Sequence, residues 1–127
     1  MIEHDLTRQI LLCLTALTFL VLAVRTVFTP QKVASELGYT LVGANGHSEL
    51  YAIYVGLWIA SAALAFFAAV RVGDALLGDI VAMLVLAQPF GRCIALIRYG
   101  MPRGPLLVFF ALEVVGGVLL LIVRPST

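Results

Sequence analysis

The sequence predicts an all-α protein, an integral membrane up-down four-helix bundle with a short interfacial helix between helices one and two. Three observations predict this fold. Of the 127 residues, 62% are hydrophobic and only 12% are charged, and the mean hydropathy is +1.09, whereas soluble domains have roughly half apolar and a quarter charged residues. Four apolar runs are long enough to cross a bilayer, and two of the links between them are short enough to force antiparallel neighbours. We therefore expect a single transmembrane domain over residues 1–127.

The charges and the reactive side chains exclude several classes of protein. Eight basic and seven acidic residues are too few to cover the surface of a soluble fold of this size. A net charge of +1 provides no basic field that would attract nucleic acid. Cys13 and Cys93 fit no CxxC or zinc-ligand spacing, and His4 and His47 stand alone in the sequence. We expect no metal site, no cofactor and no nucleic-acid partner.

The first two apolar runs predict spanning helices at residues 10–28 and 50–70. A bilayer core of about 30 Å requires roughly twenty helical residues. The first run is interrupted only by Arg25 near its end, where a long side chain can snorkel to the interface, and the second run carries no charge. A removable signal peptide is the alternative interpretation of the first run. The acidic flank and the lack of a small-residue cleavage motif favour a permanent helix.

The connection at residues 29–48 is long enough to have structure of its own at the membrane interface. Thr29 and Pro30 have the pattern of an N-cap and a first-turn proline. A short interfacial helix that buries Val33 and Leu37 is therefore predicted. The Ala-Asn-Gly segment that follows predicts a turn that returns the chain to the second span.

The third and fourth apolar runs, residues 75–97 and 105–123, predict the remaining spans. The links on either side of the third span are short, so consecutive spans are antiparallel neighbours. Asp74 has the position of an N-cap for the third helix. The resulting up-down arrangement places both chain termini on one side of the membrane.

These two runs carry charged residues inside the membrane. A charged side chain at mid-bilayer costs about 2.5 kcal/mol or more, so it normally faces the bundle interior, a partner or a cavity. At a rise of about 1.5 Å per residue from the side with the longer connections, Arg92 is expected about 8 Å deep and Glu113 about 12 Å deep. Because the two spans are adjacent, we expect Arg92 to pair with Glu113.

Other polar residues gather in the same half of the membrane. Gln88 precedes Arg92 by four residues and shares its helix face, and Tyr54 lies about 7 Å deep on the second span. Pro89 removes a backbone hydrogen bond and adds a kink, which widens the space beside this face. We interpret the cluster as a polar well beneath a cover. Its candidate ligand-binding residues are Glu113, Arg92, Gln88, Tyr54, Glu49 and Trp58. An ion pair that only fixes the bundle is an alternative of equal weight.

Asp79 is assigned to structure rather than to a site. It lies about one helical turn inside the side of the termini, where an arginine would neutralise it. We expect a structural ion pair between Asp79 and Arg71, with Arg8 and Arg124 as the other available partners.

The second span also carries a face of small residues, which predicts close packing against another helix. The residues of this face are Ala52, Gly56, Ala60 and Ala63.

Three stretches of the chain carry a family resemblance. They are SELYAIYVGL at residues 48–57, GRCIALIRYGMP at residues 91–102, and the later acid Glu113. Together they resemble a bacterial family of small four-helix membrane proteins described only as a domain of unknown function, DUF4345. The resemblance implies a four-helix fold and a bacterial inner membrane location, and it implies no activity.

The resemblance is carried by particular positions. The family pattern has an acid and an arginine before A-x-Y-G-G, a Gly-Arg pair before G-x-P, and an acid in the last helix. The matching residues are Glu49, Ala52, Tyr54, Gly56, Gly91, Arg92, Gly100, Pro102 and Glu113. Tyr51 stands where the arginine is expected and Val55 replaces the first glycine. A pairing with that arginine would be lost here, or moved to another arginine such as Arg98.

Three functions remain open from the sequence. The first is a non-catalytic module that binds membrane lipid or another lipid-like or isoprenoid-like hydrophobic small molecule in the polar well, as an accessory subunit of a larger membrane complex or as a homo-oligomer. The second is a small membrane enzyme, a lipid isomerase or proton-transfer catalyst that uses Glu113 and Arg92. The third is a proton or solute carrier with Asp79 and Glu113 on opposite sides of the midplane. The sequence has no nucleophile triad, phosphate loop or redox cysteine pair that names a reaction.

Overall fold

The computed structural model describes residues 2–125, with side chains from residue 5 onward, so the side chains of Glu3 and His4 lie outside the described residues. Within this part the chain is helical and contains no strand. Its elements are α1 (Ile2–Phe28), α2 (Pro30–Glu36), α3 (Gly43–Tyr51), the π-helix η1 (Ala52–Leu57), α4 (Trp58–Val70), α5 (Ala75–Tyr99) and α6 (Pro105–Ile122). Because α3, η1 and α4 follow one another without a break, they form one continuous span. Four helical segments are long and apolar enough to cross a membrane, which confirms the predicted all-α membrane fold.

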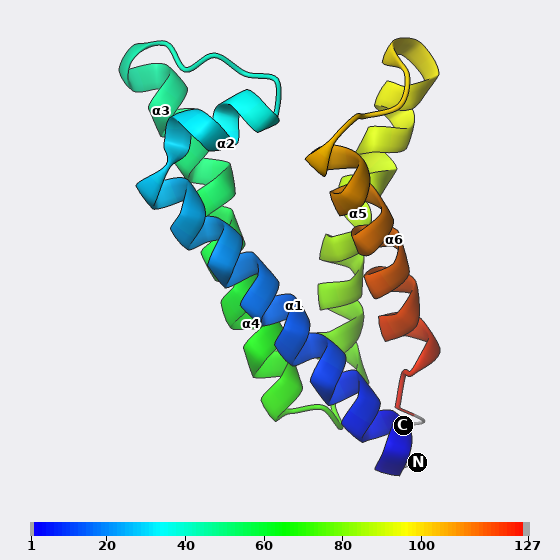
Figure 1. The fold of residues 1–127 in the computed structure, drawn as a ribbon. Helices are drawn as coiled ribbons and strands as arrows, with labels where there is room; N and C mark the ends of the chain where they lie inside the picture. Colours follow the sequence, from blue (N-terminus) through cyan, green and yellow to red (C-terminus); the bar gives the residue numbers. More distant parts are fainter. Residues whose placement is uncertain (1, 126–127) are drawn as a thin grey trace.

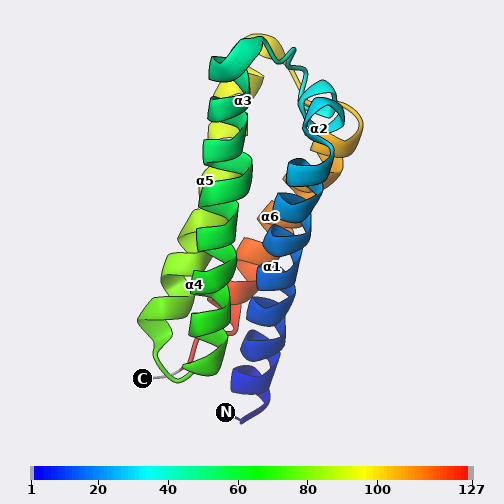
Figure 2. The ribbon, with the colours of Figure 1, turned by 90° about the vertical axis from the view of Figure 1, so that its left-hand side faces the viewer.

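The long helices form two antiparallel pairs. α1 packs along α4, and α5 packs along α6, whereas α1 and α6 meet only sparingly. The two pairs lie close together at the end where α1 begins and α6 finishes, and they diverge toward the other end (Figure 1). A view turned by 90° shows α1 and α4 running side by side in front of α5 and α6 (Figure 2). The bundle is therefore closed at the end that holds the termini.

Small residues build the closed end. Ala62, Ala65 and Ala69 of α4 are buried against Leu12 and Ala16 of α1 in one hydrophobic core. Alanine lets helix backbones approach closely, which is the usual basis of helix packing in membranes. On the side of α5 and α6, the core continues through Val81, Ala82, Val85 and Leu120. Since the core ends about halfway along the bundle, the diverging half has room for a cavity.

A charged cluster joins α1, α5 and the end of α6 at the closed end. Asp79 accepts hydrogen bonds from Arg8 Nη2 at 2.8 Å and from Arg124 Nε at 2.7 Å. Arg8 is completely buried, and its guanidinium lies flat against Gly78, because an added Cβ on this glycine would be 2.6 Å from Arg8 Cζ. The expected structural ion pair of Asp79 is present, but its partners are Arg8 and Arg124, the other two candidates, and not Arg71. Arg71 is exposed in the turn before α5 and lies 4.0 Å from Asp74, three residues along the chain.

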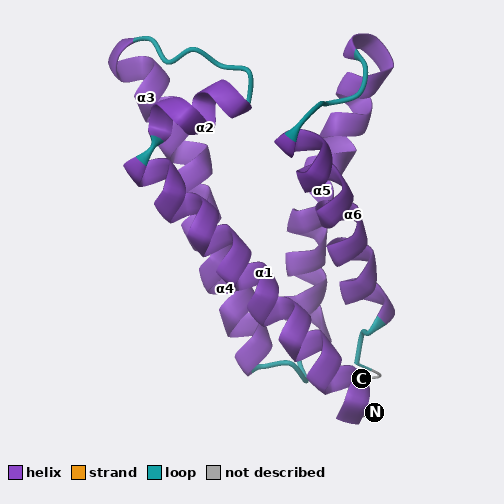
Figure 3. Cartoon of the chain, viewed as in Figure 1, coloured by secondary structure: helices purple, strands orange, loops and turns teal. Residues whose placement is uncertain are grey.

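The short helix α2 lies at the diverging end (Figure 3). It begins with Pro30 directly after Thr29, as predicted, although the Thr29 hydroxyl donates to the carbonyl of Arg25 and makes no cap bond. Val33 is buried, and Leu37 is half-buried at the C-terminal end of the helix. The short helix predicted between the first and second spans is therefore confirmed.

The second span begins earlier than predicted. Its helix starts at Gly43 rather than at residue 50, so the predicted Ala-Asn-Gly turn is wrong. The chain reverses instead between Gly38 and Gly43, whose φ angles of +83° and +63° favour glycine. The helical residues before Leu50 are mostly polar and extend the helix beyond the apolar run, so a count of apolar residues does not detect them. The π-helix η1 was also not expected, because a π turn has no compositional signature.

The small-residue face of the second span does not pack inside the bundle. Its four members, Ala52, Gly56, Ala60 and Ala63, are all exposed. The neighbouring face, with Ser61, Ala62, Ala65, Ala68 and Ala69, is buried instead. Both faces consist of small residues, so composition alone could not select the one that meets α1.

Candidate functional site

A cavity of about 370 Å³ lies between the two helix pairs and extends from the middle of the bundle, at Leu11 and Leu119, toward the diverging end, at Leu37 and Phe109. All four spans line it, together with Leu37 at the end of α2. Most of its wall is apolar and consists of leucine, valine and phenylalanine side chains. The polar side chains that reach it are Thr15, Thr18, Tyr54, Gln88, Arg92 and Glu113. Four of these six, Tyr54, Gln88, Arg92 and Glu113, were predicted from the sequence as ligand-binding candidates.

Arg92 and Glu113 form the charged part of the cavity wall. Arg92 Nη1, on α5, donates a hydrogen bond to Glu113 Oε1, on α6. The side chains are 25% and 15% exposed, so each is mostly enclosed while still reaching the cavity. The structure thus brings together the two charges that the depth estimate placed at similar levels. Because the pair is neutral as a unit, it places polarity in the membrane without a net charge.

An aromatic group forms the opposite wall. Tyr54 of η1 and Trp58 of α4 meet edge-on with ring centroids 4.9 Å apart, and Phe19 of α1 lies 6.0 Å from Trp58. All three residues line the cavity. Such rings provide a rigid apolar surface, and Tyr54 and Trp58 add polar atoms at their tips.

Glu49 is placed elsewhere. It lines a separate hollow of about 260 Å³ with Tyr39, Thr40 and Leu41 at the outer end of α3. Tyr54 is the residue that this hollow shares with the main cavity. The prediction grouped Glu49 with Arg92 and Glu113 because it stands at the head of the second span. Since the helix actually begins at Gly43, Glu49 lies on its outer part and not in the main cavity.

The two glycines of α6 that follow Glu113, Gly116 and Gly117, have different surroundings. Gly116 lines the cavity, and an added Cβ there would meet nothing within 4 Å. Gly117 is buried, and an added Cβ there would collide with the side chain of Leu86 on α5. Gly116 therefore leaves open space beside the ion pair, whereas Gly117 permits the close packing of α5 and α6.

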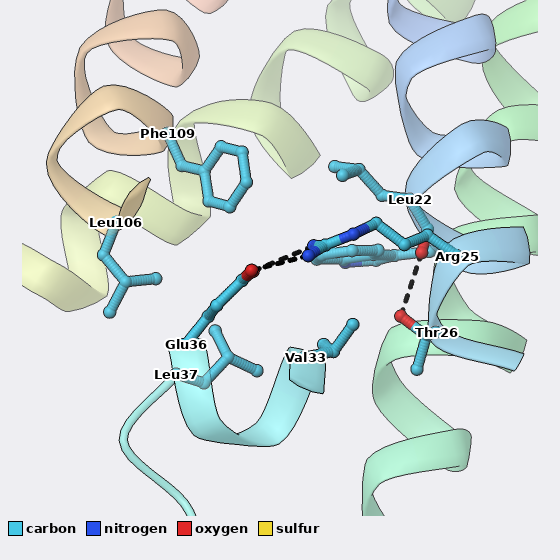
Figure 4. A pocket seen from close by; sticks show the side chains of 9 residues that line it. Leu22, Arg25, Thr26, Val33, Glu36, Leu37, Leu106 and Phe109 are labelled. Carbon is cyan, nitrogen blue, oxygen red and sulfur yellow. Dashed lines mark hydrogen bonds and ion pairs between the residues drawn. The ribbon is translucent and has the colours of Figure 1, made fainter. Parts of the chain in front are cut away.

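A second ion pair, which the sequence interpretation missed, lines a smaller hollow that shares Leu22, Leu37, Trp58 and Phe109 with the cavity. Arg25 Nη1 and Nη2 donate to the two carboxylate oxygens of Glu36 at 2.9 and 2.5 Å, so the contact is bidentate. Figure 4 shows this pair between Leu37 of α2 and the facing side chains of Leu106 and Phe109 on α6. Arg25 was expected to snorkel to solvent. The available signal was the opposite charge eleven residues later, at the other end of the turn and helix that follow α1.

The Arg25–Glu36 pair makes the attachment of α2 sensitive to pH. The two hydrogen bonds from Arg25 hold the pKa of Glu36 below its usual value. A lowered pKa in the folded state stabilises the protein above the ordinary glutamate pKa, and this contribution is lost as the pH falls through the lower folded value. We expect amide hydrogen exchange in α2, corrected for the intrinsic pH dependence, to rise relative to α4 when the pH is lowered below the ordinary glutamate range. The variant Glu36→Gln should show the same excess exchange already at neutral pH, and a parent without such a pH effect would contradict the role of the pair.

The two threonines in the cavity wall have their hydroxyl hydrogens engaged by the backbone. Thr15 Oγ1 donates to the carbonyl of Leu11, and Thr18 Oγ1 donates to the carbonyl of Leu14. Their lone pairs remain as acceptors. Among the described side chains, no three His, Cys, Asp or Glu residues lie together as metal ligands would. Asp79 does not line the cavity, so the two acids of the carrier hypothesis do not share it.

A family model with the description "Domain of unknown function (DUF4345)" matches residues 7–124, which is nearly the whole chain. The chain belongs to the DUF4345 family. The match runs from α1 to beyond the end of α6, so the DUF4345 domain includes both helix pairs and every residue of the cavity. Beyond this DUF4345 model, no curated protein and no solved structure is recognisably similar to the chain.

Proposed function

We propose that this DUF4345 protein is a membrane module that binds one lipid-like or isoprenoid-like amphiphile in the cavity between its helix pairs. It would act in a bacterial inner membrane, as an accessory subunit of a larger complex or as a homo-oligomer. The observation that carries the proposal is the combination of a largely apolar cavity with a buried ion pair and several uncharged polar groups.

The dimensions of the cavity support this proposal. Its volume of about 370 Å³ is within the range of roughly 300–1,000 Å³ that is typical of small-molecule sites. The leucine, valine and phenylalanine side chains of the wall suit a hydrocarbon chain, because contact with them removes apolar surface from any water that enters the cavity. The polar groups suit a head group and would fix the orientation of the molecule.

The position of the ion pair also supports a binding role. Ionisable residues inside a membrane are costly and normally face a pathway, a partner or a cavity. Arg92 and Glu113 face a cavity rather than a closed core. Gly116 leaves open space beside Glu113, so a ligand in the cavity could reach the pair.

A cavity-filling substitution tests the proposal. Gly116→Leu projects a side chain into the cavity, and we expect it to abolish the retention of amphiphiles that co-purify with the parent protein, as measured by mass spectrometry of solvent extracts. Gly91→Leu is the matched control, because Gly91 is exposed on α5, does not line the cavity and also has nothing within 4 Å of an added Cβ. Thermal unfolding of both variants in the same detergent establishes that they are folded.

Two outcomes contradict the proposal. One is a parent protein that carries no compound above the level of bulk membrane lipid. The other is an equal amount of the same compound bound to the parent and to the folded Gly116→Leu variant.

A further inference from the structure

We infer that the cavity selects an amphiphile whose head group is uncharged and bears a hydroxyl, such as a long-chain alcohol. This inference rests on the proposed function and names the ligand class of the same site. It follows from two properties of the polar groups that reach the cavity, namely their summed charge and the hydrogen bonds that they still have available.

The charges that reach the cavity cancel. Arg92 and Glu113, the charged side chains that line the cavity, are bonded to each other, and Arg25 and Glu36, which line a smaller neighbouring hollow, are also bonded to each other. A carboxylate or phosphate head group would place an excess negative charge beside Glu113, and an ammonium head group would place an excess positive charge beside Arg92. An unpaired charge in a low-dielectric site is strongly unfavourable. The site therefore favours a head group without charge.

Several groups at the cavity are hydrogen-bond acceptors without a hydrogen to donate. Thr15 and Thr18 donate their hydroxyl hydrogens to the backbone, which leaves only lone pairs. The carboxylate of Glu113 is an acceptor through both oxygens, and one of them receives the bond from Arg92. These acceptors can each receive a hydrogen bond from a donor on the ligand.

Donors are present at the same place. A guanidinium carries five N–H donors, and the bond to Glu113 uses only Nη1 of Arg92. Gln88 precedes Arg92 by one helical turn, lines the cavity, and carries an amide that both donates and accepts. These donors require an acceptor on the ligand.

A hydroxyl is the small uncharged group that donates and accepts at one atom. An ester, an ether or a quinone carbonyl accepts only, so it could not donate a hydrogen bond to Thr15, Thr18 or Glu113. A neutral hydrogen bond that only the alcohol can form contributes about 1 kcal/mol to its binding. The structure therefore favours an alcohol over an ether or a carbonyl compound of the same chain length.

Trp58 provides a direct measurement, since it is the single tryptophan of the chain and lines the cavity. Bromine atoms quench tryptophan fluorescence on contact. The full-length protein in phosphatidylcholine vesicles would be titrated with dibrominated stearyl alcohol, its methyl ether, dibrominated stearate and dibrominated stearylamine, with the bromines on the same carbons. The Gly116→Leu variant, whose cavity is filled, gives the background quenching by probe in the surrounding bilayer. The control variant Gly91→Leu should be quenched as the parent is.

The expected result is excess quenching of the parent by the alcohol, with an apparent affinity about fivefold higher than for the ether, the factor that one neutral hydrogen bond supplies. Stearate and stearylamine should bind no more tightly than the ether. If the ether or either charged probe bound as tightly as the alcohol, or more tightly, the head-group inference would be overturned and the proposed function would stay intact. No excess quenching by any probe would contradict both.

Substitution of Gln88 provides a second test. It compares the affinities of one variant for the alcohol and for the ether, so a general change in folding would affect both. Gln88→Met keeps the length of the side chain and removes its donor and acceptor. We expect the preference for the alcohol over the ether to fall about fivefold, because the amide oxygen of Gln88 can accept a hydrogen bond from the alcohol only, whereas the loss of its N–H donors weakens the binding of both ligands equally. Gln31→Met, at an exposed position of α2, is the control and should keep the full preference. An unchanged preference in Gln88→Met would contradict the hydrogen-bonding basis of the inference.

Discussion

Replacing Gly78 by alanine is expected to lower the free energy of unfolding by about 3 kcal/mol, the low end of the cost of breaking a buried ion pair. The added Cβ would lie 2.6 Å from Cζ and Nη2 of Arg8 and 2.7 Å from its Nε. Arg8 is completely buried, so its guanidinium has no solvent-filled space into which it can move. The guanidinium would have to shift away from the added Cβ, and in this enclosed position we expect the shift to disrupt its contact with Asp79. Unfolding in mixed micelles, with helix content as the signal, measures the loss.

Gly91→Ala is the matched control for this prediction. Gly91 is in the same helix, is exposed, and has nothing within 4 Å of an added Cβ. Alanine there should leave the stability unchanged or raise it by up to about 1 kcal/mol, because alanine is the better helix former. Equal effects of the two substitutions would mean that helix propensity, and not the contact with Arg8, determines the result.

The second large effect is expected at the ion pair of the cavity. Glu113→Gln removes the counter-charge of Arg92 in the membrane, and we expect the free energy of unfolding to fall by about 2.5 to 3.5 kcal/mol. Retention of amphiphiles should fall with it, because an uncompensated guanidinium would draw water into the cavity. Both quantities are measured on the same preparations, by unfolding in mixed micelles and by mass spectrometry of extracts.

The double substitution Arg92→Met with Glu113→Gln distinguishes the loss of the attraction within the pair from the cost of leaving the Arg92 charge isolated. Removing both charges should restore most of the stability that Glu113→Gln loses, since the cost comes from the isolated charge more than from the lost attraction. Arg98→Met, at an exposed position near the end of α5, should be close to neutral. If Glu113→Gln and the parent had equal stability and equal bound lipid, neither the pair nor the cavity would have the role described.

The spanning helices and the charged pair of the cavity could be predicted because each depends on one simple quantity. Apolar runs of about twenty residues identify membrane spans, and a rise of about 1.5 Å per residue places side chains at comparable depths. That estimate placed Arg92 and Glu113 within reach of each other, and the structure joins them. This estimate of depth requires no knowledge of how each helix is oriented about its own axis.

The features that were missed depend on rotation and on the path of the chain outside the apolar runs. Which small-residue face of the second span meets α1 is decided by packing, and both faces have similar composition. The early start of α3 at Gly43 depends on two left-handed glycines, and its polar residues carry no hydrophobic signal. The Arg25–Glu36 pair requires α2 to fold back toward α1, which cannot be inferred from depth. Glu49 was placed in the wrong hollow for the same reason.

The asymmetry between the two ends of the bundle has a consequence for where a ligand comes from. The ion-pair cluster around Asp79 holds the two helix pairs together on the side of the termini. The helix pairs diverge toward the end that holds α2 (Figure 1). A ligand that binds as proposed would exchange more readily with the monolayer on the side of α2 than with the other one. The occupancy of the cavity would then depend on how that ligand is distributed between the two monolayers.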